Sequence, residues 1–243
     1  MKKHNTSTKI ISFLNYKDIL IILGSWYFMA AILLITRELT LEHSLLTHIF
    51  HFLFIVSGRF IYFSLMIFYL TSIYPVEFHH LGLNFHDFKK QLALGLSKTI
   101  ALLILVLVFL NVPLSYADDI DIHAIYNIVG PESFISSLIP FLLIFFCCIF
   151  ISLSEQFILN VVIFELFKYT IFNTFISVIL TALLYSMIIA NLTPSRILIN
   201  FIAAIISILL YQRKHSIIPS TLFMAGYYSI YIAYVYGWSF IRF

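Results

Sequence analysis

The chain has 243 residues, of which 62% are hydrophobic and only 10% are charged, and its formal net charge is +3. Soluble domains contain about 25% charged residues, so this composition excludes an ordinary soluble domain, and so small a charge gives no indication of nucleic-acid binding. Several apolar runs approach or exceed the roughly 20 residues that a helix needs to cross a bilayer, which predicts a polytopic membrane protein embedded in the lipid bilayer.

The predicted elements begin with a polar, basic tail over residues 1–18, placed in the cytoplasm. No short apolar stretch with a small-residue cleavage site follows it, so no cleaved signal peptide is expected. Residues 19–243 are predicted to form a single membrane domain. The fold class is all-α, a transmembrane helix bundle of about seven spans, with six to eight as the range. The expected spans are Ile19–Ile35, Ile49–Tyr74, Thr99–Val112 (or from Leu92), Phe134–Phe164, Phe175–Ala190, Ile197–Leu210 and Ile217–Tyr234.

The fourth span, Phe134–Phe164, is longer than a bilayer is thick. It must therefore tilt, kink near Ser154, or project beyond the lipid. Its second half contains a polar cluster, Glu155, Gln156 and Asn160, inside an otherwise apolar run. That cluster is the main candidate site in the sequence.

Lysine and arginine predict the orientation, because they concentrate in cytoplasmic segments. With the N-terminus inside, the outer segments hold only Arg37, Arg196 and Arg242, and Arg59 falls within the second span. The inner segments hold ten basic residues: Lys2, Lys3, Lys9, Lys17, Lys89, Lys90, Lys98, Lys168, Arg213 and Lys214. We therefore expect a cytoplasmic N-terminus and an external C-terminus. Abundant Ile, Phe, Leu, Asn and Lys indicate an AT-rich bacterial genome, and hence a bacterial cell membrane.

Arg59 is a charged residue well inside the second span. A charge at that depth costs on the order of 2.5–3.5 kcal/mol on insertion scales, so such residues usually face the bundle interior and have a partner. Two interpretations remain open. Arg59 forms a structural ion pair or extends to the interface, or it takes part directly in function.

Glu155 raises the same question, because a carboxylate removed from water must gain a cation, bind a metal or take up a proton. It belongs to a functional polar pocket or, if the helix ends early, lies at the interface. Arg59 is the first candidate partner. The predicted boundaries separate the two along the membrane normal by on the order of 10 Å, at about 1.5 Å per residue. The alternative is a neutral Glu155 that is hydrogen-bonded by Gln156 and Asn160.

Three further groups have the residue types of a site without a spacing that defines one. The inner connector VEFHHLGLNFHDFKK and the outer segment EHSLLTHIFH contain metal-ligand types, but a solvated connector is the preferred interpretation of the first. The Tyr-rich end, AGYYSIYIAYVYGW, is typical of an interfacial aromatic belt with packing tyrosines, and a binding surface is the alternative. The residues concerned are Glu77, His79, His80, His86, Asp87, His43, His48 and His51; Cys147 and Cys148 are expected to be packing residues.

Three blocks of sequence resemble the CAAX protease and bacteriocin-processing family, called CPBP or Abi. They are LSEQFILNVVIFELF, FISVILTALLYSMIIANLT and IAAIISILLYQRKHSIIPSTLFMAGYYSI, preceded by the connector-like LGLNFHDFKKQLALGL. The resemblance covers about residues 81–230. It rests on the apolar framework and on the positions of the motifs, and it implies a CPBP/Abi-like membrane core over that range.

Most signature residues of that family are replaced here. Glu155 matches the first residue of the Glu-Glu pair, but Gln156 replaces the second, and Asn160 stands in place of Arg. In the second block Tyr185 keeps the aromatic position, while Ile189 replaces the His. In the third, Pro219 is kept, Phe223 replaces His, and Tyr227 replaces Asn. The family's metal-assisted or Glu-activated hydrolysis needs carboxylate and imidazole donors, and Ile and Phe have none.

The resemblance therefore implies a degenerate member with no confident catalytic residue, no metal ligands and no cofactor. Glu155, Arg59 and Asn160 are the predicted binding residues. We expect a protein or peptide partner in the membrane, in bacteriocin self-immunity or as a scaffold or chaperone of an envelope enzyme or peptide-processing system. Two alternatives remain: an active intramembrane peptidase with a rearranged site, which would require zinc, and a subunit of a transporter or channel.

Overall fold

The computed structural model describes residues 14–39, 45–109, 134–189 and 194–235, and over these ranges the chain is helical, with short connections and no strand. This confirms the all-α part of the prediction. Seven helices lie in the described ranges, one at each predicted span. They are α2 (Tyr16–Leu39), α3 (Leu45–Ile73), α4 (Phe88–Phe109), a continuous helix made of α6 (Phe134–Gln156), η2 (Phe157–Phe164) and α7 (Glu165–Ile171), α8 (Thr174–Ile189), α9 (Pro194–Lys214) and α10 (Ile217–Val235).

Most helices extend beyond their predicted bounds. The largest difference is in α4, which begins at Phe88 where the prediction had Thr99 or Leu92. The first turn of α4 carries Lys89 and Lys90. Polar residues of this kind favour a connector, but a helix can continue past its apolar segment. The predicted ends Val112 and Ala190 lie outside the described residues.

Three helices are long and apolar enough to cross a membrane: Phe52–Ile73, Phe141–Ile171 and Ile197–Lys214. Two shorter apolar helical segments, Thr174–Met187 and Ile217–Ile232, accompany them. Large apolar side chains such as Phe68 on α3 and Phe146 on α6 are exposed, at 70% and 59%, as expected for surfaces that face lipid.

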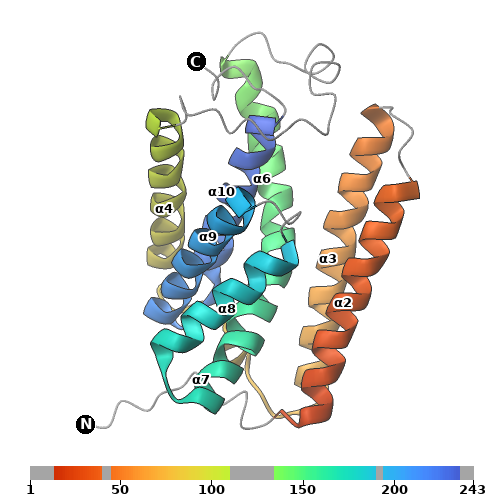
Figure 1. Cartoon of the computed structure of the whole chain (residues 1–243), viewed down its shortest axis with the longest axis vertical. Helices are drawn as coiled ribbons and strands as arrows, with labels where there is room; N and C mark the ends of the chain where they lie inside the picture. Colours follow the sequence, from red (N-terminus) through yellow and green to blue (C-terminus); the bar gives the residue numbers. More distant parts are fainter. Residues whose placement is uncertain (1–13, 40–44, 110–133, 190–193, 236–243) are drawn as a thin grey trace.

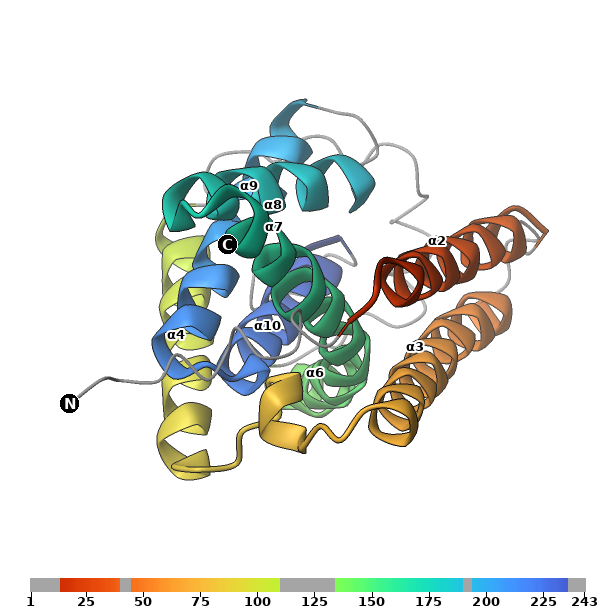
Figure 2. The same cartoon turned by 90° about the horizontal axis from the view of Figure 1, so that it is seen from below.

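The helices are arranged around α6 and α10. α10 packs against α6, α4 and α9, and α8 packs against α9. α2 and α3 form a hairpin on one side of the molecule, with α4 on the other (Figures 1 and 2). α3 is the helix of the hairpin that packs against α6, so residues on α3 can reach the centre of the bundle.

A close contact between α4 and α10 helps to position the site. A Cβ atom at Gly226 would lie 2.2 Å from the Thr99 side chain, so only glycine permits this approach. At the same contact Thr99 Oγ1 donates to the Leu222 carbonyl oxygen at 3.1 Å. Small residues allow membrane helices to pack closely in this way, and the contact fixes the helix that carries Tyr228.

The connector between α3 and α4 is tied to the bundle. It contains a short 3-10 helix, η1 (Phe78–Leu81), whose last residue, Leu81, is fully buried. Gly82 follows with a φ of 74°, a left-handed conformation that favours glycine. Its carbonyl oxygen accepts a hydrogen bond from the Ile217 N–H at 2.9 Å, so the connector is anchored at the start of α10.

Candidate functional site

The middle of the long α6–η2–α7 helix is buried, including every residue from Ser154 to Glu165. The sequence allowed a kink near Ser154, whereas the structure has a π-helix over Phe157–Phe164. π-Helical segments are rare and often occur at functional sites. Glu155 and Gln156 lie immediately before this segment and Asn160 lies inside it, so the candidate polar cluster coincides with the irregular part of the helix.

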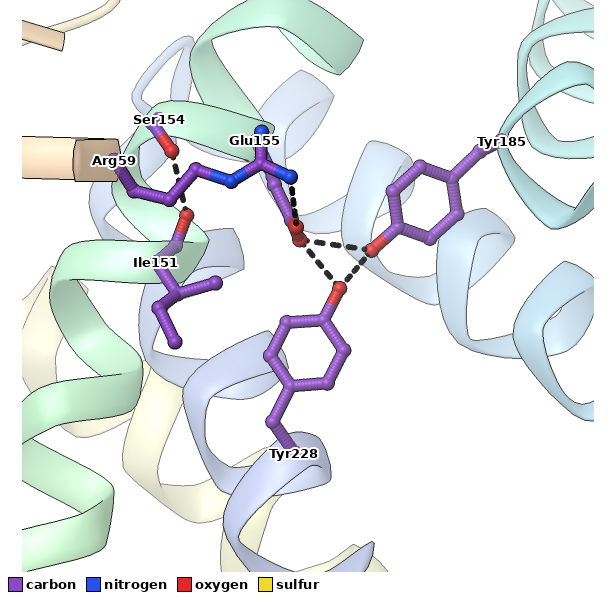
Figure 3. Close-up of polar contacts among 6 residues, drawn as sticks. All are labelled: Arg59, Ile151, Ser154, Glu155, Tyr185 and Tyr228. Atoms are coloured by element: carbon purple, nitrogen blue, oxygen red, sulfur yellow. Dashed lines mark hydrogen bonds and ion pairs between the residues drawn. The ribbon is translucent and has the colours of Figure 1, made fainter. Parts of the chain in front are cut away.

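Glu155 is 6% exposed and is held by two tyrosines from other helices. Tyr185 on α8 donates its O–H to Glu155 Oε2 at 3.2 Å, and Tyr228 on α10 donates to the same oxygen. The two phenol oxygens also lie within hydrogen-bond reach of each other (Figure 3). The carboxylate therefore joins α6, α8 and α10.

The number of hydrogens limits how these contacts can be made. Three oxygen atoms are in mutual contact, and each phenol supplies a single hydrogen. An ionised Glu155 therefore leaves one of the three contacts without a hydrogen, while a protonated carboxyl group supplies the third. The geometry accommodates both states of the carboxyl group that the sequence left open.

Arg59 lies beside this carboxylate. Its Nη2 atom is 4.0 Å from Glu155 Oε1, and its guanidinium carbon lies 3.9 Å from the centre of the Trp26 ring on α2. The structure thus places Arg59 beside Glu155, as the direct pair requires, and whether Glu155 is ionised or neutral stays a prediction. The expected offset of on the order of 10 Å does not occur, because Arg59 is the middle residue of α3 and the Glu155 helix continues to Ile171. Both residues therefore lie near the middle of their helices.

Gln156 and Asn160 form a separate buried cluster. Asn160 Nδ2 donates to Gln156 Oε1 at 2.8 Å and to Ser220 Oγ at 3.2 Å, and Ser207 Oγ also donates to Gln156 Oε1. The prediction that these amides donate to Glu155 is therefore wrong. Residues i and i+4 share a helix face, whereas neighbouring residues do not, so Gln156 pairs with Asn160 and points away from Glu155.

The other family-like positions are spread over the bundle. Phe223 is 2% exposed and packs in the core, and Tyr227 donates to Asn200 Oδ1 at 2.6 Å. Ile189 is the last residue of α8, and its side chain lies outside the described part of the structure. Among these positions, the structure brings Glu155 into contact with Tyr185 and Gln156 into contact with Asn160.

These residues do not fit the zinc ion that the family resemblance would require. Glu155 Oε2 already accepts from two phenols, and its Oε1 faces a cation. The positions of the two expected imidazoles hold hydrocarbon side chains that cannot bind a metal. Among the described residues, no group of three His, Cys, Asp or Glu side chains could hold a metal ion. That the bundle binds no zinc stays a prediction.

The histidine-containing segments show local pairing where they are described. In the connector, His79 Nδ1 lies 3.0 Å from Glu77 Oε2, the Glu77 backbone N–H donates to His80 Nδ1, and Lys90 pairs with Asp87 at 3.3 Å. The His86 backbone N–H donates to Asn84 Oδ1. These exposed contacts match the interpretation of a solvated connector.

The remaining candidate residues are the outer histidines and the two neighbouring cysteines. His43 lies outside the described residues, and the side chains of His48 and His51 on α3 do too. Cys147 and Cys148 are free thiols, the first half-buried and the second buried, which agrees with a packing role.

Sequence reasoning missed Tyr228 and Trp26 as members of the site. Tyr228 was assigned to a general aromatic belt, although a tyrosine in the middle of an apolar helix needs a partner for its O–H. Trp26 lies on α2, one of the helices to which no site residue was assigned. The only available signal was the presence of these aromatic residues within predicted spans.

A second carboxylate, Asp18 in the first turn of α2, was also missed. Tyr69 donates to Asp18 Oδ1 at 2.8 Å, and Tyr74 donates to Oδ2. The hydrogen bonds from Tyr74 and then Tyr69 lower the pKa of the Asp18 carboxyl group below its ordinary value. Tyr69 on α3 and Tyr74, the residue just after its end, thus hold the start of α2.

A third carboxylate, Glu165, is 2% exposed and begins α7. Lys168 Nζ lies 3.6 Å from its Oε2, and neither carboxylate oxygen has a hydrogen-bond partner among the described residues. The i, i+3 spacing within ELFK was the signal that could have predicted this pair.

Comparisons with known proteins do not extend this description. No protein-family model, curated protein or solved structure matches the chain.

Proposed function

We propose that the chain is a multi-pass protein of a bacterial cell membrane, with a cytoplasmic N-terminus and an external C-terminus, that acts by binding a protein or peptide partner in the membrane. Its fold is that of a catalytically degenerate CPBP/Abi-like protein. Its role is bacteriocin self-immunity, or scaffolding or chaperoning of an envelope enzyme or peptide-processing system. The proposal rests on the residues of the three family-like blocks and on the contacts of Glu155.

The observation that carries this proposal is the occupation of the Glu155 carboxylate. A general base needs a free lone pair directed at a water or substrate. Here one oxygen accepts from Tyr185 and Tyr228, and the other faces Arg59. Such a carboxylate is suited to hold together the helices that a partner contacts, and poorly suited to activate water.

One observation favours the peptidase alternative. A π-helix begins directly after Gln156, and irregular helical segments often accompany catalytic groups. A shift of Tyr185 and Tyr228 would free Glu155 for hydrolysis with a rearranged site. The transporter or channel alternative draws on the charged pair in the middle of the bundle, since ionisable residues at that depth often line an ion path.

Two substitutions of Glu155 separate binding from hydrolysis. Glu155→Gln keeps the shape and the hydrogen-bonding capacity but cannot act as a general base. Leaving Arg59 unpaired lowers the stability of Glu155→Gln, but we expect its folded fraction to retain biological activity and the partners recovered from native membranes. Glu155→Leu should lose most of both. The measurements are the biological activity in cells and quantitative pull-down, with Ser57→Ala on the exposed face of α3 as a control.

If Glu155→Gln abolishes activity while expression and partner binding stay normal, the peptidase alternative replaces this proposal. A hydrolysed membrane peptide that accumulates with the native chain and not with Glu155→Gln would support the same conclusion.

The orientation is tested by labelling. With cysteines introduced at Asn5 and Asp119, which both lie outside the described residues, we expect a membrane-impermeant thiol reagent to label only position 119 from the external side. The two native cysteines, Cys147 and Cys148, are replaced by serine for this experiment. Labelling of position 119 only from the cytoplasmic side would reverse the topology.

A further inference from the structure

Arg59 has hydrogen-bond donors that nothing in the described structure satisfies. Its Nε and Nη1 atoms are buried and have no partner among the described residues. The Glu155 carboxylate is 4.0 Å from Nη2, which is an ion-pair distance and too long for a hydrogen bond. A guanidinium group carries five N–H donors in a planar fork, so Arg59 retains most of its capacity to bind an acceptor.

The charge at the site determines which acceptor fits. With Glu155 ionised, as in the 4.0 Å ion pair with Arg59, the two charges together are neutral. A further anion would then leave one uncompensated negative charge in a medium of low dielectric, where that is costly. An uncharged oxygen acceptor satisfies the free N–H groups without adding charge. Building on the proposed partner-binding function, we propose that Arg59 binds backbone carbonyl oxygens of the partner's membrane segment.

Only some membrane segments offer such oxygens. A regular helix uses its own carbonyl groups within the helix, and in lipid every backbone polar group must be satisfied. A helix interrupted by proline loses one of these internal hydrogen bonds and leaves a carbonyl oxygen free. Arg59 is the middle residue of α3, so the ligand is a peptide segment whose helix is interrupted near the bilayer centre.

Trp26 covers one face of the Arg59 guanidinium group. Its ring lies over the guanidinium group at 3.9 Å, and the Trp26 side chain is 7% exposed. α2, which carries Trp26, packs against α3 at the side of the molecule (Figure 2). The Arg59 side chain keeps 12% exposure, and the proposal requires the Trp26 ring to move so that an acceptor reaches the free nitrogens. Binding therefore changes the surroundings of Trp26.

The experiment compares designed peptides that differ in one feature. The full chain is reconstituted in lipid nanodiscs with a fluorescent peptide of about 20 Leu and Ala residues flanked by lysines. One peptide is uninterrupted, the second has a central Gly-Pro pair, and the third has a central Glu. We expect energy transfer to report about tenfold tighter binding of the Gly-Pro peptide than of the other two, because it alone offers an uncharged free acceptor.

The variants assign this preference to Arg59. Removing both charges with Arg59→Met and Glu155→Gln together avoids an unpaired buried Glu155, and this double variant should bind the three peptides alike. Ser57→Ala, on the exposed face of the same helix, should keep the tenfold preference. In a Trp238→Phe background Trp26 is the only tryptophan, and its emission should shift with the Gly-Pro peptide alone.

Equal binding of the three peptides to the native chain, including no measurable binding, overturns the inference. So does a preference that survives in the double variant, or a preference for the Glu peptide, which would make Arg59 an anion site. The proposed function fails separately, when Glu155→Leu leaves the native partners unchanged. If the native chain shows no Gly-Pro preference but its native partners still depend on Glu155, the carbonyl contact is rejected and the proposed function stands.

Discussion

Two carboxylates in this protein are each held by two tyrosines, but in different surroundings. Asp18 lies at the beginning of α2 and accepts from Tyr69 and Tyr74, both near the end of α3. Glu155 lies in the middle of its helix and accepts from Tyr185 and Tyr228, which belong to two different helices. Arg59 faces Glu155, whereas no ion pair involves Asp18 among the described residues.

The difference follows from depth. Asp18 lies at a helix end, close to water and headgroups that help to stabilise a charge. It accepts from the two phenols and from the Asn15 backbone N–H at 3.0 Å, without a cation. In the middle of the bundle the cost of an unpaired charge is higher, and a cation is added. The cluster around Asp18 therefore joins two neighbouring helices, while the cluster around Glu155 joins four elements of the bundle.

The largest expected effect tests the cation. Arg59→Met alone leaves Glu155 facing a hydrocarbon, and breaking a buried pair on one side costs about 3 kcal/mol or more. Combining it with Glu155→Gln should restore most of that stability, because the charge left unpaired is then removed. The measurement is the midpoint of unfolding in a detergent titration for both single variants and the double variant. Additive losses would show that the two charges do not interact.

A smaller effect separates the two tyrosine pairs. Tyr228→Phe removes one hydrogen bond at the bundle centre, and single hydrogen bonds in membrane proteins contribute about 0.6 kcal/mol on average and up to about 1.7. Tyr69→Phe at the Asp18 cluster should lower the unfolding midpoint by less, because water can replace the lost donor there. Equal losses in the two variants would contradict the depth argument.

The smallest effect concerns pH. The pKa of Asp18 is lowered by Tyr74 and Tyr69, so the unfolded chain binds a proton more readily than the folded chain. The stability from this group is therefore complete above the ordinary pKa of an aspartic acid, about 3.9, and is lost as the pH falls through the lower folded value. Asp18→Asn should be less stable than the native chain near neutral pH, with a difference that shrinks below about pH 4. Thermal unfolding in detergent across this range measures the difference. A constant difference would show that the carboxylate charge plays no part.

Much of the helical framework could be predicted from the sequence, because apolar runs of sufficient length have few alternatives to helices in a membrane. Each predicted span coincides with a helix, and the predicted boundaries erred mostly where charged or polar residues continue a helix, as at Phe88. Local contacts were predictable in principle as well. Glu165 and Lys168 lie three residues apart on one helix, where the chain itself brings them together.

The contacts of the candidate site required the tertiary structure. Glu155 and Tyr228 are 73 residues apart in sequence, and no local pattern connects a tyrosine in an aromatic-rich helix with a carboxylate in another. The relative depth of Arg59 and Glu155 depends on where α3 begins and where the Glu155 helix ends. An error of several residues at each boundary produced the predicted offset between the two residues, on the order of 10 Å. The sequence alone determined which residues are costly to bury, since that depends on their chemistry. Which helices supply their partners was decided only by how the helices pack against one another.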